Sequence, residues 1–152
     1  MPRICFEDLE EGTVDTFGPR AITREEIIAY ASEYDPQPMH LDEEAARHTM
    51  LGGLAASGWH TCSFLMRMMY DGYLKDSSAA GSPGVEETRW LKPVRPGTQL
   101  TLRRSILDKR VSRSRPGFGV VRFRWELLDE AGVTLTEVTC PILFGLREGG
   151  GQ

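Results

Sequence analysis

The sequence has few cysteines, no long apolar run and no excess of positive charge. Cys5, Cys62 and Cys140 are far apart and form no CxxC pair, so we expect reduced thiols and neither a disulfide framework nor a zinc cluster. No stretch approaches the ~20 apolar residues of a membrane span. The net charge of -4 gives no electrostatic case for binding nucleic acid. The acidic first residues lack the apolar segment of a secretory signal, and we expect a cytoplasmic protein.

What is present suits a globular domain. The chain has 152 residues, of which 40% are hydrophobic and 26% are charged, enough to bury a core. We expect a single domain over residues 1–146, followed by a flexible tail over 147–152, "REGGGQ".

The first half of the chain carries helix signals. Thr23 is a predicted N-cap with Glu26 as its capping-box partner, which predicts a helix over residues 24–34 that ends before Pro36. Asp42 is expected to cap a second, short helix. A third helix is expected to begin at Ser57-Gly58. Apolar residues lie almost all round it, which predicts burial on most faces.

The second half carries strand signals. Residues 75–84 are expected to form a loop, and strands are predicted over 85–94, 98–111, 117–128 and 133–146, with "DEAG" as a hairpin turn. A further strand is expected at 13–17. Long strands joined by short turns beside one buried helix predict an α+β fold, in which an antiparallel sheet curves around a long central helix.

A stiff turn separates an acid from an imidazole in "YDPQPMHLD", residues 34–42. Asp35 and His40 would face different sides of a continuous helix, but across a turn held by Pro36 and Pro38 they can converge. A carboxylate and an imidazole that share one water can divide base and acid work near neutral pH. The spacing alone equally fits two residues that cap neighbouring helices.

The segment "GGLAASGWHT" offers the second part of a site. Gly58 at the start of a helix would present a backbone N–H without a side chain in the way, and a helix N-terminus favours an oxyanion. The alternative is that these glycines serve turns and packing.

Three stretches together carry a family resemblance: "YDPQPMHLDEEAAR", "GGLAASGWHTCSFLMR" and "TRWLKPVRPGTQL". They resemble the MaoC-like dehydratases, the R-specific enoyl-CoA hydratase family, over about Phe6 to Leu146. The resemblance implies a hot-dog fold and hydration or dehydration of a 2-enoyl or 3-hydroxyacyl thioester. It implies that Asp35 and His40 are catalytic and that the Gly58 N–H polarises the thioester carbonyl.

The resemblance also implies where the substrate is contacted. Ser63 matches a serine that supports the catalytic pair. Gln37 stands where the family often has Asn, and Ser57 where it often has His. We expect the side chains of Ser63, Gln37 and Ser57 to contact the substrate. No metal or cofactor is expected, since coenzyme A enters as part of the substrate. The expected partners are an acyl-CoA or acyl-carrier thioester and further copies of the chain in a homodimer or higher homo-oligomer, with no nucleic acid or membrane.

Two other functions fit the same sequence. A hot-dog thioesterase would attack the carbonyl carbon of the thioester, and a non-catalytic subunit would bind acyl-CoA without turnover. Several side chains also have two interpretations each. They are His60, a metal ligand or a core residue; Tyr30, Tyr34, Trp59 and Trp90, tunnel or packing residues; and Arg89, Lys92 and Arg95, phosphate contacts or solvated charges.

Overall fold

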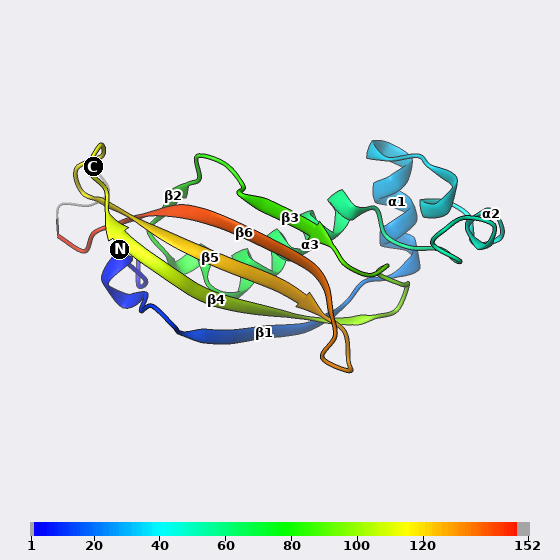
Figure 1. The fold of residues 1–152 in the computed structure, drawn as a ribbon, viewed down its shortest axis with the longest axis horizontal. Helices are drawn as coiled ribbons and strands as arrows, with labels where there is room; N and C mark the ends of the chain where they lie inside the picture. Colours follow the sequence, from blue (N-terminus) through cyan, green and yellow to red (C-terminus); the bar gives the residue numbers. More distant parts are fainter. Residues whose placement is uncertain (1, 149–152) are drawn as a thin grey trace.

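A six-stranded antiparallel sheet wraps around one long helix in the computed structural model, which describes residues 2–148 (Figure 1). The sheet order is β1-β4-β5-β6-β2, and β3 also pairs with β6. The strands are β1 Val14–Ala21, β2 Ala79–Gly81, β3 Glu87–Trp90, β4 Gln99–Val111, β5 Phe118–Leu128 and β6 Thr134–Gly145. The long helix is α3, Gly58–Gly72. This arrangement is a hot-dog fold, and it confirms the predicted α+β class.

Period-2 alternation in β5 builds the inner face of the sheet. Val121, Phe123 and Trp125 are buried, and the arginines between them point outward. Phe123 stacks on Trp125 with ring centroids 5.3 Å apart. The turn into β6 contains Gly132, whose φ of 80° is the left-handed conformation that glycine adopts without strain. The "DEAG" hairpin is therefore confirmed.

Two helices extend the fold at the end where α3 begins (Figure 1). α1 spans Arg24–Tyr34 as predicted, and the Thr23 hydroxyl accepts from the Glu26 N–H at 3.1 Å. α2 spans Glu43–Arg47, and Asp42 caps it by accepting from two backbone N–H groups. Such caps stabilise a helix by ~1 kcal/mol each, so local sequence fixes both helix starts.

The segment before the long strands differs from the prediction. Residues 75–84 contain the end of a short 3-10 helix, η3 Leu74–Asp76, and strand β2, which pairs with β6. The prediction of a plain loop was wrong because pairing with β6 outweighs a composition rich in Ser and Gly. The strand predicted over 85–94 is shorter, since only Glu87–Trp90 pairs with β6.

The long helix is less buried than its composition predicts. The face formed by His60, Phe64, Leu65, Met68 and Met69 packs under the sheet. The other face is open: Trp59 is 62% exposed, Met66 52% and Tyr70 50%. The sheet curves around one side of α3 only, so burial on most faces was a wrong prediction.

The predicted flexible tail lies largely outside the described residues, which end at Glu148. Of its first residues, Arg147 donates from its backbone N–H to Glu7 at 3.1 Å and pairs with Asp8 through its guanidinium. Within residues 2–148, no helix is long and apolar enough to cross a membrane.

Candidate active site

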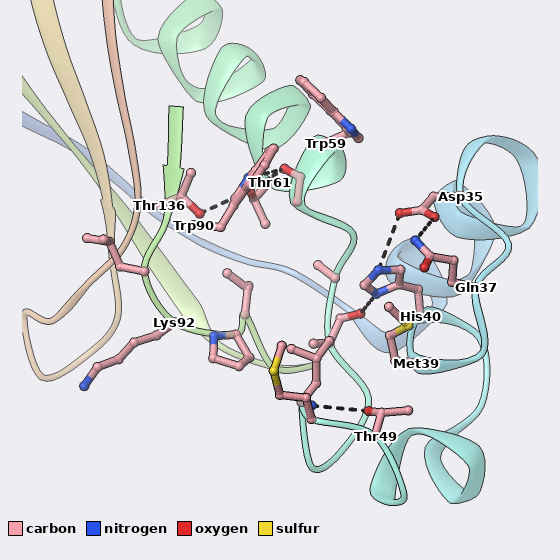
Figure 2. A pocket seen from close by; sticks show the side chains of 18 residues that line it. Asp35, Gln37, Met39, His40, Thr49, Trp59, Thr61, Trp90, Lys92 and Thr136 are labelled. Carbon is pink, nitrogen blue, oxygen red and sulfur yellow. Dashed lines mark hydrogen bonds and ion pairs between the residues drawn. The ribbon is translucent and has the colours of Figure 1, made fainter. Parts of the chain in front are cut away.

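Asp35 and His40 converge across the proline turn (Figure 2). Asp35 is the residue that ends α1, and His40 ends the short 3-10 helix η2, Pro38–His40. The Asp35 Oδ2 and His40 Nε2 atoms are 3.4 Å apart. Pro38 stands at the start of η2, where its fixed φ suits the helix and its missing N–H costs nothing. The turn brings together two side chains that a continuous helix would separate.

Two neutral side chains hold the Asp35 carboxylate. The Ser57 hydroxyl donates to Oδ2 at 2.6 Å, and the Gln37 amide donates to Oδ1 at 2.7 Å. Ser57 is fully buried, whereas the Asp35 side chain keeps 17% of its surface exposed. The carboxylate is therefore fixed in orientation but still reachable from the cavity.

The His40 ring is oriented by a backbone carbonyl. Its Nδ1 atom lies 2.7 Å from the Ala55 oxygen. A carbonyl oxygen can only accept, so Nδ1 carries a hydrogen and donates. That contact leaves Nε2 facing Asp35 as the nitrogen that can gain or lose a proton. The rest of the ring is buried.

The environment keeps Asp35 ionised. Burial raises the pKa of Asp35, but hydrogen bonds from Ser57 and Gln37, together with the charge of His40, outweigh it. The pKa ends below its ordinary value of 3.8. Asp35 is thus a carboxylate at neutral pH, ready to accept a proton from a water or a hydroxyl group.

The N-terminus of α3 adjoins this pair. Ser57, which donates to Asp35, is the N-cap, and Gly58 is the first helical residue. Among the residues that the structure describes, the Gly58 N–H has no acceptor, as is usual in the first turn of a helix. A partial positive charge at the helix end therefore lies one residue from the serine that binds the carboxylate.

A cavity of about 580 Å³ joins these groups (Figure 2). It opens between the proline turn, the segment before α3 and the end of β3. Its wall is mostly apolar. The lining includes Asp35, Gln37, Met39, His40, Met50, Leu51, Ala55, Gly58, Trp59, Thr61, Trp90, Val94 and Thr136. An acid, an imidazole and a helix N-terminus facing one apolar cavity suit proton transfer to and from a bound acyl group.

Comparison with known proteins shows to which family this chain belongs. The family model of the MaoC-like domain matches residues 6–122. The chain belongs to the MaoC-like domain family. A MaoC-like dehydratase from Rhodospirillum rubrum is 36% identical, with a TM-score of 0.88 over 95% of this chain and 98% of that one.

Two further comparisons differ in what they show. The Bacillus subtilis protein YdeM, itself uncharacterised, is 32% identical over 97 residues, which are 63% of this chain and 68% of its own. The R-hydratase PhaJ1 from Pseudomonas aeruginosa has a TM-score of 0.75 over 95% of this chain and 87% of that one. At 21% identity, PhaJ1 supports the fold alone.

One predicted site residue of this MaoC-like chain lies elsewhere. The Ser63 hydroxyl donates to the Trp59 carbonyl at 3.0 Å and does not contact the pair. Ser63 lies five residues past Gly58, a rotation that leaves it about 140° around the helix. Ser57 instead supplies the hydroxyl that supports Asp35.

The predicted substrate contacts divide in the same way. Gln37 lines the cavity and binds Asp35, whereas Ser57 reaches the carboxylate from the buried side. Both side chains therefore orient the Asp35 carboxylate. Sequence spacing could not show these two hydrogen bonds.

The basic residues near the cavity have different partners. Arg95 donates to the carbonyl oxygens of Leu51 and Leu54, and so ties down the segment before α3. Arg89 pairs with Glu87 at 3.6 Å. Lys92 lines the cavity. Of the three candidate phosphate contacts, only Lys92 stands at the cavity.

The aromatic candidates also separate. Trp59 and Trp90 line the cavity, whereas Tyr30 stacks on the buried His60 ring at 4.5 Å between centroids. Tyr34 is exposed. His60 is therefore a packing residue between α1 and α3, and the core hydrogen bond expected of it is not seen: among residues 2–148 its buried Nδ1 atom has no hydrogen-bond partner.

Sequence reasoning missed part of the cavity wall. Met39, Met50, Thr61 and Thr136 line it and were not proposed. Met39 lies within the turn, between Asp35 and His40, and could have been found from that position. Met50 lies in the segment that leads to α3. Thr136 lies on β6, far along the chain, and only the sheet brings it to α3.

Loss of the Ser57 hydroxyl is expected to shift the acid limb of activity. Ser57→Ala removes a contact that lowers the pKa of Asp35, so this pKa rises. A reaction that needs the carboxylate is active above the pKa and lost below it. The acid limb of kcat/KM should therefore move to higher pH. Ser63→Ala removes a helix hydroxyl that does not touch Asp35 and should leave the limb in place. If the acid limb of the kcat/KM profile lay at the same pH in wild type and Ser57→Ala, Ser57 would not be what lowers the pKa of Asp35.

Proposed function

We propose that the protein is a hydratase or dehydratase acting on a 2-enoyl or (R)-3-hydroxyacyl thioester. One observation carries the proposal: the His40 Nε2 atom and the Asp35 carboxylate stand 3.4 Å apart, facing an apolar cavity that the N-terminus of α3 also faces. Membership in the MaoC-like family supports the class of reaction. The likeness to a MaoC-like dehydratase across nearly the whole chain supports it further.

In the hydration direction, the pair would hold one water against the substrate. The Asp35 carboxylate accepts one proton of that water while its oxygen attacks Cβ. Because Ser57 and Gln37 fix the carboxylate, the water is held on one face of the double bond. Addition from one face gives one stereochemistry at Cβ.

As the C–O bond forms, the electrons of the double bond move toward the thioester oxygen. The Gly58 N–H at the helix end stabilises the negative charge on that oxygen. His40 in its imidazolium form then gives the Nε2 proton to Cα. Its Nδ1–H stays hydrogen-bonded to the Ala55 carbonyl. The proton now on Asp35 returns to Nε2 across the short gap, and both groups are restored. Dehydration runs through the same steps in reverse.

The test is a screen of 2-enoyl-CoA substrates of increasing chain length. We expect loss of the absorbance of the conjugated thioester and formation of the (R)-3-hydroxyacyl product by chiral analysis. Activity should be highest for acyl chains that fill the apolar cavity.

Two other outcomes would replace the proposal. Release of free coenzyme A from saturated acyl-CoA, without hydration of enoyl-CoA, would make the protein a thioesterase. Tight binding of acyl-CoA without turnover would make it a non-catalytic binding subunit.

A further inference from the structure

The Gly58 carbonyl accepts hydrogen bonds from two side chains on different elements. The Thr61 hydroxyl donates at 2.6 Å and the Trp90 indole N–H donates at 2.9 Å. Thr136 on β6 donates to the Thr61 oxygen at 3.1 Å and so extends the network into the sheet. All four residues line the cavity of the acid-base pair. Figure 2 shows Thr61, Trp90 and Thr136 gathered at the start of α3.

Trp90 also covers Gly58 with its ring. A Cβ atom added at Gly58 would lie 2.6 Å from the Trp90 Cε2 atom, so the indole rests directly on the glycine. Trp90 and Trp59 pack edge to face, with centroids 5.2 Å apart and planes at 78°. Because Thr61 and Thr136 are almost fully buried, their hydroxyls exchange little with water. The Gly58 peptide is thus held from several sides.

These contacts have a consequence for the amide on the other side of the same peptide. The Gly58 carbonyl and the Trp59 N–H belong to one planar unit, so fixing the oxygen fixes the direction of the N–H. A carbonyl that accepts strong hydrogen bonds also polarises its own peptide, and this makes the N–H a better donor.

The preceding peptide is held in the same way. The Ser57 carbonyl accepts from the Thr61 N–H at 3.1 Å, which orients the Gly58 N–H. Neither the Gly58 N–H nor the Trp59 N–H has an acceptor among residues 2–148. Two adjacent donors therefore leave the first turn of α3, where both residues line the cavity.

We propose that Trp90 is a positioning residue, which with Thr61 aligns the Trp59 N–H as a second donor, beside Gly58, to the thioester oxygen. The inference rests on the proposed function. Trp90, which also lines the cavity, acts on the reaction through the Gly58–Trp59 peptide. Two donors match the two lone pairs of an oxygen that gains charge in the transition state.

The test compares two tryptophans that each lose one indole hydrogen bond. Trp90→Phe keeps an aromatic ring over Gly58 but removes the donor, and kcat for enoyl-CoA hydration is expected to fall about tenfold with KM changed less than about twofold. Trp125→Phe removes the bond from its indole to the Tyr73 hydroxyl in the core, away from the pair. It should lower the melting temperature and leave kcat within about twofold.

A second comparison separates the hydroxyl of Thr61 from its shape. Thr61→Val is expected to lower kcat by a similar factor, about tenfold, whereas Thr61→Ser keeps the donor to Gly58 and should stay near wild type. The proposal is overturned if Trp90→Phe and Thr61→Val both keep wild-type kcat, or if Trp125→Phe loses as much kcat as Trp90→Phe.

A readout without turnover keeps the inference separate from the proposed function. Saturated butyryl-CoA, which cannot be hydrated, is titrated into the ¹⁵N-labelled protein. In wild type, the Gly58 and Trp59 amide resonances should both shift downfield on binding. In Trp90→Phe, the shift at Trp59 should shrink and the shift at Gly58 should persist. If wild type fails to hydrate any 2-enoyl-CoA, the proposed function fails. If the Trp59 amide shifts equally in wild type and Trp90→Phe, the inference about Trp90 fails, whatever the outcome for the proposed function.

Discussion

Asp35→Asn or His40→Gln is expected to lower kcat for 2-enoyl-CoA hydration by at least about 100-fold, the usual loss when a positioned acid or base is removed. Asparagine cannot take a proton from water, and its amide would meet the Ser57 hydroxyl or the Gln37 amide donor. Glutamine can still donate to the Ala55 carbonyl but cannot carry a proton to Cα. Loss of the enoyl-thioester absorbance with crotonyl-CoA measures the rate.

The two substitutions should not be additive. Both groups hold one water and exchange one proton, so the double variant is expected to be about as slow as the slower single variant. Asp42→Asn and His48→Gln are matched controls, because Asp42 caps α2 and His48 is exposed at its end. Both controls should keep wild-type kcat. Asn at position 42 can still cap α2, and the exposed His48 side chain is not part of the site. Wild-type hydration in either Asp35→Asn or His40→Gln would refute the mechanism.

Local sequence signals predicted the elements that place this pair. Thr23 and Asp42 are caps that satisfy backbone groups within a few residues, and Pro36 and Pro38 restrict the chain between them. These effects depend only on neighbours along the chain. The start of α3 at Gly58 was also predicted, because Ser57-Gly58 precedes a segment with apolar residues almost all round a helix.

The contacts that hold the site in place could not be read from spacing. The Ser57–Asp35 bond joins residues 22 apart, the His40–Ala55 bond 15 apart and the Trp90–Gly58 bond 32 apart. Each joins segments whose contact depends on tertiary packing and not on neighbours along the chain. Family resemblance supplied Ser63 as the supporting serine, but rotation along the helix carries it away from Asp35. Residue type and spacing thus predicted that Asp35 and His40 converge, but not which side chains orient them.

The open face of α3 also depends on tertiary structure that the sequence pattern does not show. Hydropathy shows that Trp59, Met66 and Tyr70 are apolar or aromatic, but it does not show how far a six-stranded sheet curves. The sheet covers one side of the helix, and the N-terminal end of the other side leads to the cavity at Trp59. A buried core and an accessible site therefore share one helix.

Gly58→Ala is expected to lower kcat by about 10- to 100-fold while leaving the protein folded. The backbone at Gly58 is helical, so alanine fits it and even favours the helix by ~1 kcal/mol. The obstacle is space: the new methyl would lie 2.6 Å from Cε2 and 2.8 Å from Nε1 of Trp90. If the indole moves, it loses its bond to the Gly58 carbonyl, and the expected loss is about tenfold, as for Trp90→Phe. If the first turn of α3 shifts instead, the expected loss is about 100-fold. A displacement of ~1 Å at the oxyanion donor is enough for a loss of this size.

Gly72→Ala is the matched control for this clash. Its methyl would meet the Phe17 ring at 2.7 Å, again an aromatic contact on α3, but at the opposite end of the helix from Asp35 and His40. Both variants are expected to lose stability, by ~1–3 kcal/mol of overpacking, and thermal unfolding measures this loss. Only Gly58→Ala should also lose kcat, because only that clash displaces the N–H groups that face the thioester oxygen. Wild-type kcat in Gly58→Ala would mean that the start of α3 takes no part in the reaction, and the negative charge of the enolate would then need a different donor.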